Sequence, residues 1–129
     1  MGYLYLDGRG VVQDFDRAFV YYSRAAEQQH ERAMNLVGRC CEEGWGTHRD
    51  LEAAASWYRR SAEGGYFRGQ YNWASILLKE GRWSEAATWF ERAAVGGSGV
   101  VRQAVINTLM RAGVRGVLRD LADRLQGAV

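Results

Sequence analysis

Residues 51–62 read LEAAASWYRRSA, and this stretch decides the fold because it recurs twice without gaps. Residues 15–26 read FDRAFVYYSRAA, and residues 83–94 read WSEAATWFERAA. In each copy an alanine is followed three and four residues later by two aromatic side chains, and eight residues later by another alanine. These spacings place the side chains on one side of an α-helix. The recurrence predicts three equivalent helices, each with a packing face of small and aromatic residues.

A second helix type lies between these segments. Residues 33–41, AMNLVGRCC, match residues 69–77, GQYNWASIL, at an offset of 36, and residues 101–109 form a weaker copy. Gly38 and Ala74 occupy the same place in this pattern, where side chains this small allow two helices to cross closely. The chain is therefore predicted to alternate two helix types, A helices at 33–41, 69–77 and 101–109, and B helices at 15–26, 51–62 and 83–94.

The connectors carry a third repeated pattern. Residues 8–14, GRGVVQD, and residues 44–50, GWGTHRD, share the form Gly-x-Gly-x-x-x-Asp. Paired glycines permit a positive φ after a helix ends, and an aspartate can cap the helix that follows. With the Ala-x-x-aromatic-aromatic segments, this loop resembles the Sel-one-like repeat family, a relative of the tetratricopeptide repeats, over about residues 1–97. The resemblance implies an all-α superhelix (solenoid) of stacked helix-turn-helix repeats.

The segment after the repeats is predicted to cover the end of the stack. A helix is expected over residues 99–112, followed by a break at Gly113 and a last helix through Gln126. Because a terminal repeat must cover the exposed end of a solenoid, we interpret this segment as a cap. The whole chain, 1–129, is then one helical-repeat domain, with three repeats in 1–97 and the cap in 98–129. One apolar stripe of the last helix is expected to face the stack: Val114, Val117, Leu118, Leu121 and Leu125.

The resemblance also implies where a partner binds. In tetratricopeptide-like stacks the A helices line the concave face, and residues at fixed offsets from the crossing residue point into the groove. Basic and amide side chains there could pair with carboxylates and hydrogen-bond a peptide backbone. The hypothesis is a protein-interaction module that holds an acidic protein segment; the alternative is that these residues are only solvated surface. The candidate groove residues are Arg32, Asn35, Arg39, Arg68, Tyr71, Ser75, Lys79, Gln103, Asn107 and Arg111.

A structural or assembly role is the second hypothesis. The first residues, with Tyr3, Leu4, Tyr5 and Leu6, would expose apolar surface if they formed the end of the stack. They are expected to pack on a second copy of the chain, giving a homodimer through the N-terminal helix, or on preceding repeats of a longer solenoid.

No combination of residues predicts an enzyme, a metal site or a cofactor site. The spacing of His30, Cys40, Cys41 and His48 matches no zinc pattern. The Gly-x-Gly loops lack the Gly-Lys-Ser/Thr ending of a phosphate-binding loop. We therefore predict no catalytic residue, no metal and no cofactor.

The composition limits the classes of partner and the cellular compartment that the sequence can predict. The formal net charge is +2, too balanced to indicate a nucleic-acid or membrane surface as partner. Cys40 and Cys41 are adjacent, so a disulfide between them would be strained and reduced thiols are expected. Without an evident signal peptide, the expected compartment is the cytoplasm, or the periplasm if a signal precedes this sequence.

Overall fold

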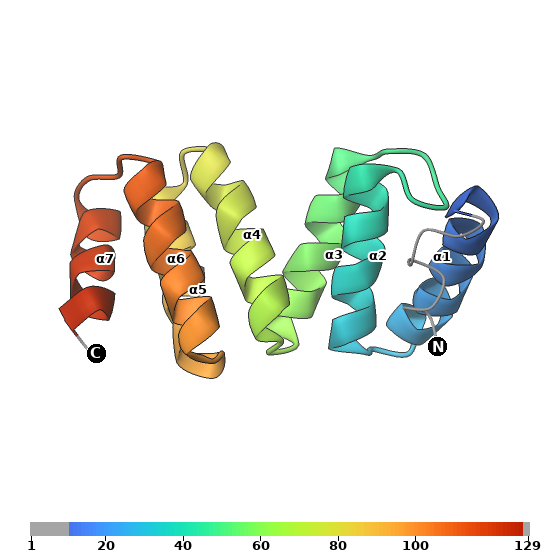
Figure 1. Ribbon diagram of the computed structural model, residues 1–129, viewed down its shortest axis with the longest axis horizontal. Helices are drawn as coiled ribbons and strands as arrows, with labels where there is room; N and C mark the ends of the chain where they lie inside the picture. The colour runs from blue at the N-terminus through green and yellow to red at the C-terminus, as the bar shows by residue number, and fades with distance from the viewer. Residues whose placement is uncertain (1–10, 128–129) are drawn as a thin grey trace.

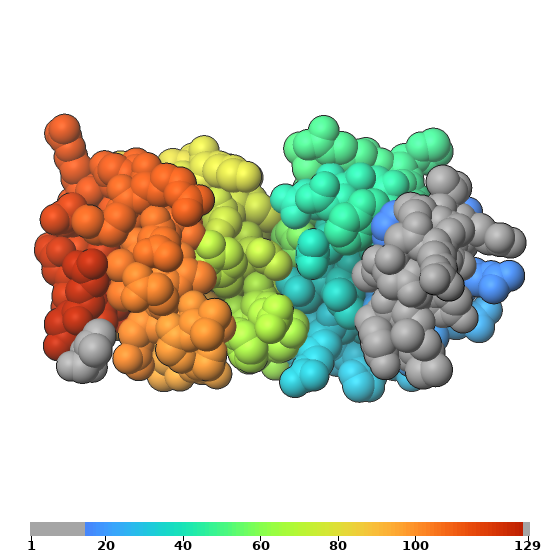
Figure 2. All heavy atoms as spheres, in the orientation of Figure 1, coloured from blue at the N-terminus to red at the C-terminus, as the bar shows by residue number. Residues whose placement is uncertain are grey.

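The computed structural model describes the backbone of residues 11–127 and the side chains of residues 15–127. Within these residues the chain forms seven α-helices and no strand. The helices are α1 (Val11–Glu27), α2 (Glu31–Glu43), α3 (Leu51–Glu63), α4 (Phe67–Lys79), α5 (Trp83–Gly96), α6 (Gly99–Arg111) and α7 (Val117–Gly127). From α1 at one end to α7 at the other the chain advances along the long axis of the molecule, with α5 and α6 overlapping in the view of Figure 1. The surface colours in Figure 2 run from blue to red along the same axis.

The order of contacts confirms the predicted solenoid of alternating helices. α1, α3 and α5 contain the B segments, and α2, α4 and α6 contain the A segments. Each helix packs on the next one in the chain, and α2 also contacts α4. The six alanines that open and close the B pattern are all at most 2% exposed: Ala18, Ala26, Ala54, Ala62, Ala86 and Ala94.

The crossing of α2 and α3 depends on the absence of a side chain at Gly38. A Cβ atom at Gly38 would lie 2.7 Å from Cε1 and 2.8 Å from Cδ1 of Tyr58. The Tyr58 ring is buried, and its hydroxyl donates a 2.7 Å hydrogen bond to Oε1 of Glu42. The ring is therefore held at both ends, and the small residue marks the close crossing that the sequence predicted.

The aromatic pairs of the B helices do not both face the core. The second aromatic of each pair is buried, as Tyr22, Tyr58 and Phe90 show. Of the first aromatics, Tyr21 is 53% exposed, whereas Trp57 and Trp89 are half-buried. Successive helical residues point about 100° apart, so only one of two neighbours can face the core fully. The predicted packing face is correct for the second aromatic and wrong for Tyr21.

The loop between α2 and α3 follows the glycine–aspartate prediction. Gly44 and Gly46 adopt φ values of 76° and 72°, and Asp50 accepts a 3.0 Å hydrogen bond from the Ala53 amide. A Cβ atom at Gly46 would lie 2.3 Å from the carbonyl oxygen of Phe15. The Phe15 ring stacks on Trp45, with 5.3 Å between centroids. Through these contacts the loop between α2 and α3 packs against the first turns of α1.

The turn after α1 keeps the shape of its glycine-containing counterpart. Gln29 stands where Gly65 stands one repeat later, and both have positive φ values, 69° and 97°. A side chain in the left-handed region costs about 1 kcal/mol. The repeated helix geometry thus imposes this turn even where the sequence lacks glycine.

α7 covers the end of the stack, as predicted for a cap. It packs on both α5 and α6, and it follows a break at which Gly113 has a φ of 64°. Val114, Leu118, Leu121 and Leu125 are buried. Val117 is the exception, because it is exposed as the first residue of α7.

Two expectations from the sequence lie outside the described residues. They are residues 8–10 of the first glycine–aspartate loop and dimerisation through Tyr3, Leu4, Tyr5 and Leu6. The rest of that predicted loop is wrong, because residues 11–14 already belong to α1 and Asp14 lies within the helix instead of capping it. Among the helices that are described, none combines the length and apolar character needed to cross a membrane.

Substitution of Gly38 tests the close crossing. We expect Gly38→Ala to be less stable than Gly99→Ala by about 1–3 kcal/mol, because the new methyl group presses on the anchored Tyr58 ring. Gly99 is the matched control, since it is helical and a Cβ atom there meets nothing within 4 Å. Urea unfolding measures both, and equal free energies of unfolding would contradict the crowded crossing.

Candidate functional site

Side-chain hydrogen bonds join the A helices at one repeated position. Nδ2 of Asn72 on α4 donates to Oδ1 of Asn35 on α2, over 2.8 Å. One repeat further on, the hydroxyls of Tyr71 on α4 and Thr108 on α6 hydrogen-bond to each other. The partners are 37 residues apart in both pairs. The A helices therefore form a connected layer, whose surface we call the A-helix face.

The B helices are not linked in this way. Among the described side chains, no hydrogen bond joins α1 to α3 or α3 to α5. Repeats are thus tied together directly on the A side. The A-helix face consequently has a defined spacing from one repeat to the next.

The structure exposes most of the ten residues that the sequence predicted for a groove. Tyr71 and Ser75 are half-buried, and Asn35 is buried. The exposed residues are Arg32, Arg39, Arg68, Lys79, Gln103, Asn107 and Arg111.

Asn35, Tyr71 and Ser75 differ from the expectation of free groove side chains. The amide oxygen of Asn35 is bound by Asn72, the Tyr71 hydroxyl is bound by Thr108, and the Ser75 hydroxyl donates to the Tyr71 carbonyl oxygen over 3.0 Å. Asn35 and Tyr71 thus join neighbouring A helices, whereas Ser75 bonds within α4. Sequence reasoning missed Asn72 and Thr108, although both occupy one repeat position, 36 residues apart, where the first repeat has Leu36.

The charge of the A-helix face is uneven. α4 and α6 carry four basic side chains, Arg68, Lys79, Arg102 and Arg111, and no aspartate or glutamate. None of the four forms an ion pair within the described part of the chain. The ion pairs lie elsewhere, for example within α3 and between α7 and α5. The two helices therefore present positive charge that the fold does not neutralise.

The two arginines of α2 rest on aromatic rings. The guanidinium carbon of Arg32 lies 5.6 Å from the Tyr66 ring centre, and that of Arg39 lies 5.1 Å from the Trp45 ring centre. Such stacking positions a guanidinium while its planar N–H donors stay available to a carboxylate. α2 also carries Glu31, Glu42 and Glu43, so the positive charge without acidic neighbours on the same helix is that of α4 and α6.

Two hollows lie between α4 and α6. The hollow at their N-terminal turns, which we call the N-terminal hollow, has a volume of about 200 Å³. The hollow at the opposite ends has a volume of about 390 Å³ and includes Lys79 and Arg111. Both are therefore bordered by basic side chains. The N-terminal hollow is lined by Phe67, Arg68, Tyr71, Val100, Val101 and Ala104.

The cysteines are built into the core. Cys40 and Cys41 are buried and free. Burial, with a smaller contribution from Cys41, raises the pKa of the Cys40 thiol to about 11, and burial also raises the pKa of Cys41. Burial disfavours the thiolate, which is the nucleophilic and metal-binding form. Within the described residues, no three histidine, cysteine, aspartate or glutamate side chains gather as metal ligands.

Comparison with known protein families decides what kind of repeat this is. A family model described as Sel1 repeat matches residues 1–30, 31–66 and 84–98, which together exceed half of the chain. This chain belongs to the Sel1 repeat family. Sel1 repeats generally act as scaffolds that bind other proteins, and the resemblance drawn from the glycine–aspartate loop is confirmed.

Solved structures of Sel1 repeat proteins share the fold. The crystal structure of a Sel1 repeat protein from Oxalobacter formigenes matches 84% of this chain and 45% of that chain, with 31% identity and a TM-score of 0.69. A protective antigen of uropathogenic Escherichia coli strains, which displays an SLR fold, matches with 29% identity and a TM-score of 0.69 over 85% of this chain and 24% of its own. The chitin synthase regulator SKT5 of Malassezia restricta is 42% identical over 57 residues, which are 43% of this chain and 4% of that protein. The chain therefore spans less than half of each relative.

The bond between Asn35 and Asn72 can be tested by substitution. Asn72→Ala leaves the buried Asn35 oxygen without its partner, so we expect a loss of about 1–3 kcal/mol in the free energy of unfolding. Asn107→Ala is the control, because that side chain is exposed and bonds only to Gln103 on its own helix. If chemical denaturation shows the same stability for both variants, the bond does not tie the A helices together.

Proposed function

We propose that this Sel1 repeat chain is an adaptor whose A-helix face forms a groove that holds an acidic segment of another protein. The observation that carries the proposal is the charge of α4 and α6, which have four basic side chains and no acidic one. Basic residues without internal ion pairs are available to a partner's carboxylates, and guanidinium groups bind carboxylates in a bidentate manner. The proposed role is binding without catalysis.

The arrangement of the basic side chains supports an extended partner segment. Arg68 borders the N-terminal hollow, while Lys79 and Arg111 border the hollow at the opposite ends of the same helices. A segment that follows the A-helix face between the two hollows would meet positive charge at each end. The exposed amides of Gln103 and Asn107 on α6 offer hydrogen bonds to its backbone between them.

Charge reversal tests the proposed groove. A displayed library of random peptides is selected on the full chain, and the affinity of the best synthetic peptide is measured by fluorescence polarisation. We expect selected peptides rich in aspartate and glutamate. Arg68→Glu combined with Arg111→Glu should weaken their binding by about tenfold or more, because attraction becomes repulsion at both ends.

The matched control reverses the same charge elsewhere. Arg92 on α5 and Arg115 beyond α6 are exposed, and neither lines the hollows between α4 and α6. Arg92→Glu combined with Arg115→Glu changes the net charge equally and should leave affinity almost unchanged. Equal losses in both double variants would show only a nonspecific charge effect. Undiminished binding to the first double variant would refute the groove.

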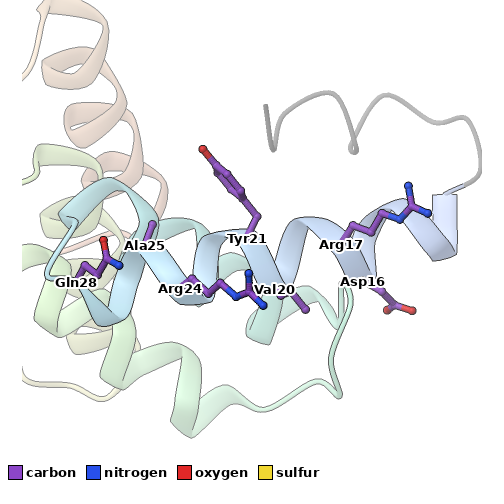
Figure 3. A pocket seen from close by; sticks show the side chains of 7 residues that line it. All are labelled: Asp16, Arg17, Val20, Tyr21, Arg24, Ala25 and Gln28. Carbon is purple, nitrogen blue, oxygen red and sulfur yellow. The ribbon is translucent and has the colours of Figure 1, made fainter.

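The exposed face of α1 favours a second candidate function, self-association. Figure 3 shows the seven side chains that line a hollow of about 720 Å³, six from α1 and Gln28 just after it. Among them are Val20 and Tyr21, which are 49% and 53% exposed. Ala25 of this set takes the repeat position of Ser61, which in the next pair packs on α2 and donates to the Glu31 carbonyl oxygen. This face is thus the one on which an A helix would pack. We propose that it binds a helix of a second copy of this chain.

Light scattering tests the self-association. The molar mass of the wild-type chain should rise toward that of a dimer as concentration increases, since association covers Val20 and Tyr21. Val20→Asp combined with Tyr21→Asp should keep the chain monomeric, with unchanged helical circular dichroism as the control for folding. A wild-type chain that stays monomeric at every concentration would exclude the dimer. The exposed face of α1 would then have no role in self-association.

A further inference from the structure

We infer that the N-terminal hollow between α4 and α6 receives one apolar side chain of the acidic segment, beside a carboxylate that pairs with Arg68. The inference rests on the proposed function and adds a requirement to it. Charge alone would accept any acidic segment. The hollow selects segments in which an apolar residue shares a face with an acidic one.

The inner wall of the hollow is apolar and fixed in place. Tyr71 packs edge-on against Phe90, with 5.8 Å between ring centroids, and its hydroxyl is bound by Thr108. Phe67 and Val101 are half-buried beside it. Because Tyr71 is held by two contacts, the hollow has a preformed wall, and a ligand does not need to order it.

Val100 is the residue that the fold leaves uncovered. Its side chain is 80% exposed at the second position of α6, although it lines an apolar hollow. Covering apolar surface of this kind is favourable because it removes the surface from water. With a volume of about 200 Å³, the hollow suits a side chain rather than another helix.

Arg68 sets the charge at the edge of the hollow. Its guanidinium carbon lies 5.7 Å from the Phe67 ring centre, so the charge stands beside the apolar wall. It forms no ion pair with the described carboxylates, and α4 and α6 contain none. A carboxylate of the partner is therefore the complementary group at this edge.

The proximity of charge and hollow defines a sequence spacing in the partner. Side chains of an extended segment alternate between its two faces, so residues two apart share a face and lie about 7 Å from one another. An apolar residue in the hollow and a carboxylate on Arg68 are then two positions apart. The recognised pattern is apolar-x-acidic or acidic-x-apolar.

Peptide selection with two matched valine variants tests this inference. The probe is the best synthetic peptide from a random displayed library selected on the full chain. Val100→Ser should weaken its binding about fivefold, because the hollow loses two methyl groups that the peptide would cover. Val95→Ser is the control, since Val95 is 77% exposed on α5 and lies outside the hollow. It should not change the affinity.

The outcomes separate this inference from the proposed function. Selected peptides with an apolar and an acidic residue two apart, together with a loss confined to Val100→Ser, support the inference. Acidic peptides without the apolar residue, or equal effects of the two serine variants, overturn the inference while the charged groove stands. Selected peptides that are not acidic and are indifferent to Arg68→Glu overturn the proposed function and the inference with it.

Discussion

The close approach of Gly38 to the Tyr58 ring is the constraint on which the two-layer arrangement depends. The hydroxyl of that ring is bound to Glu42 on the same helix as Gly38, so α2 and α3 are fixed both in separation and along their length. Tyr58 turns inward, and its neighbour Trp57 is half-buried, with the guanidinium carbon of Arg60 4.4 Å from the centre of its ring. The packing of the A helix α2 on the B helix α3 is thus fixed by contacts between these two helices themselves. The outer surface of the A layer is then free to carry side chains that the core does not need.

Much of the fold could be predicted from the sequence because it is decided by short-range patterns. The alanine and aromatic spacings identify the B helices, and the glycine–aspartate loop fixes the end of one helix and the beginning of the next, as Gly44 and Asp50 show. Where the glycine of a turn is missing from the sequence, the packing of the flanking helices still determines the backbone conformation of that turn. Gln29 adopts a left-handed conformation without being glycine, because the helices on either side are positioned by their own packing.

The candidate site was less predictable, since it depends on distances between helices. Offsets within one helix correctly placed Arg68, Lys79 and Arg111 at the surface. They could not show that Asn35 lies close enough to Asn72 to bind it. That contact depends on how far α4 is shifted relative to α2. The spacing of residues within one repeat gives no information about this shift. Val100 is similar, because an exposed valine becomes informative only when α4 is known to stand beside it.

The hydrogen bonds within the A layer determine how the stack can bend. Spreading the A helices apart breaks the Asn35–Asn72 and Tyr71–Thr108 bonds, whereas no hydrogen bond between described side chains joins α1 to α3 or α3 to α5. On that side Arg124 of the cap α7 bonds to Glu91 of α5. The A layer is therefore the more strongly connected side of the solenoid, and bending that separates the helices on the opposite side breaks fewer bonds between repeats. While these bonds hold, equivalent side chains of neighbouring A helices keep a constant distance from one another.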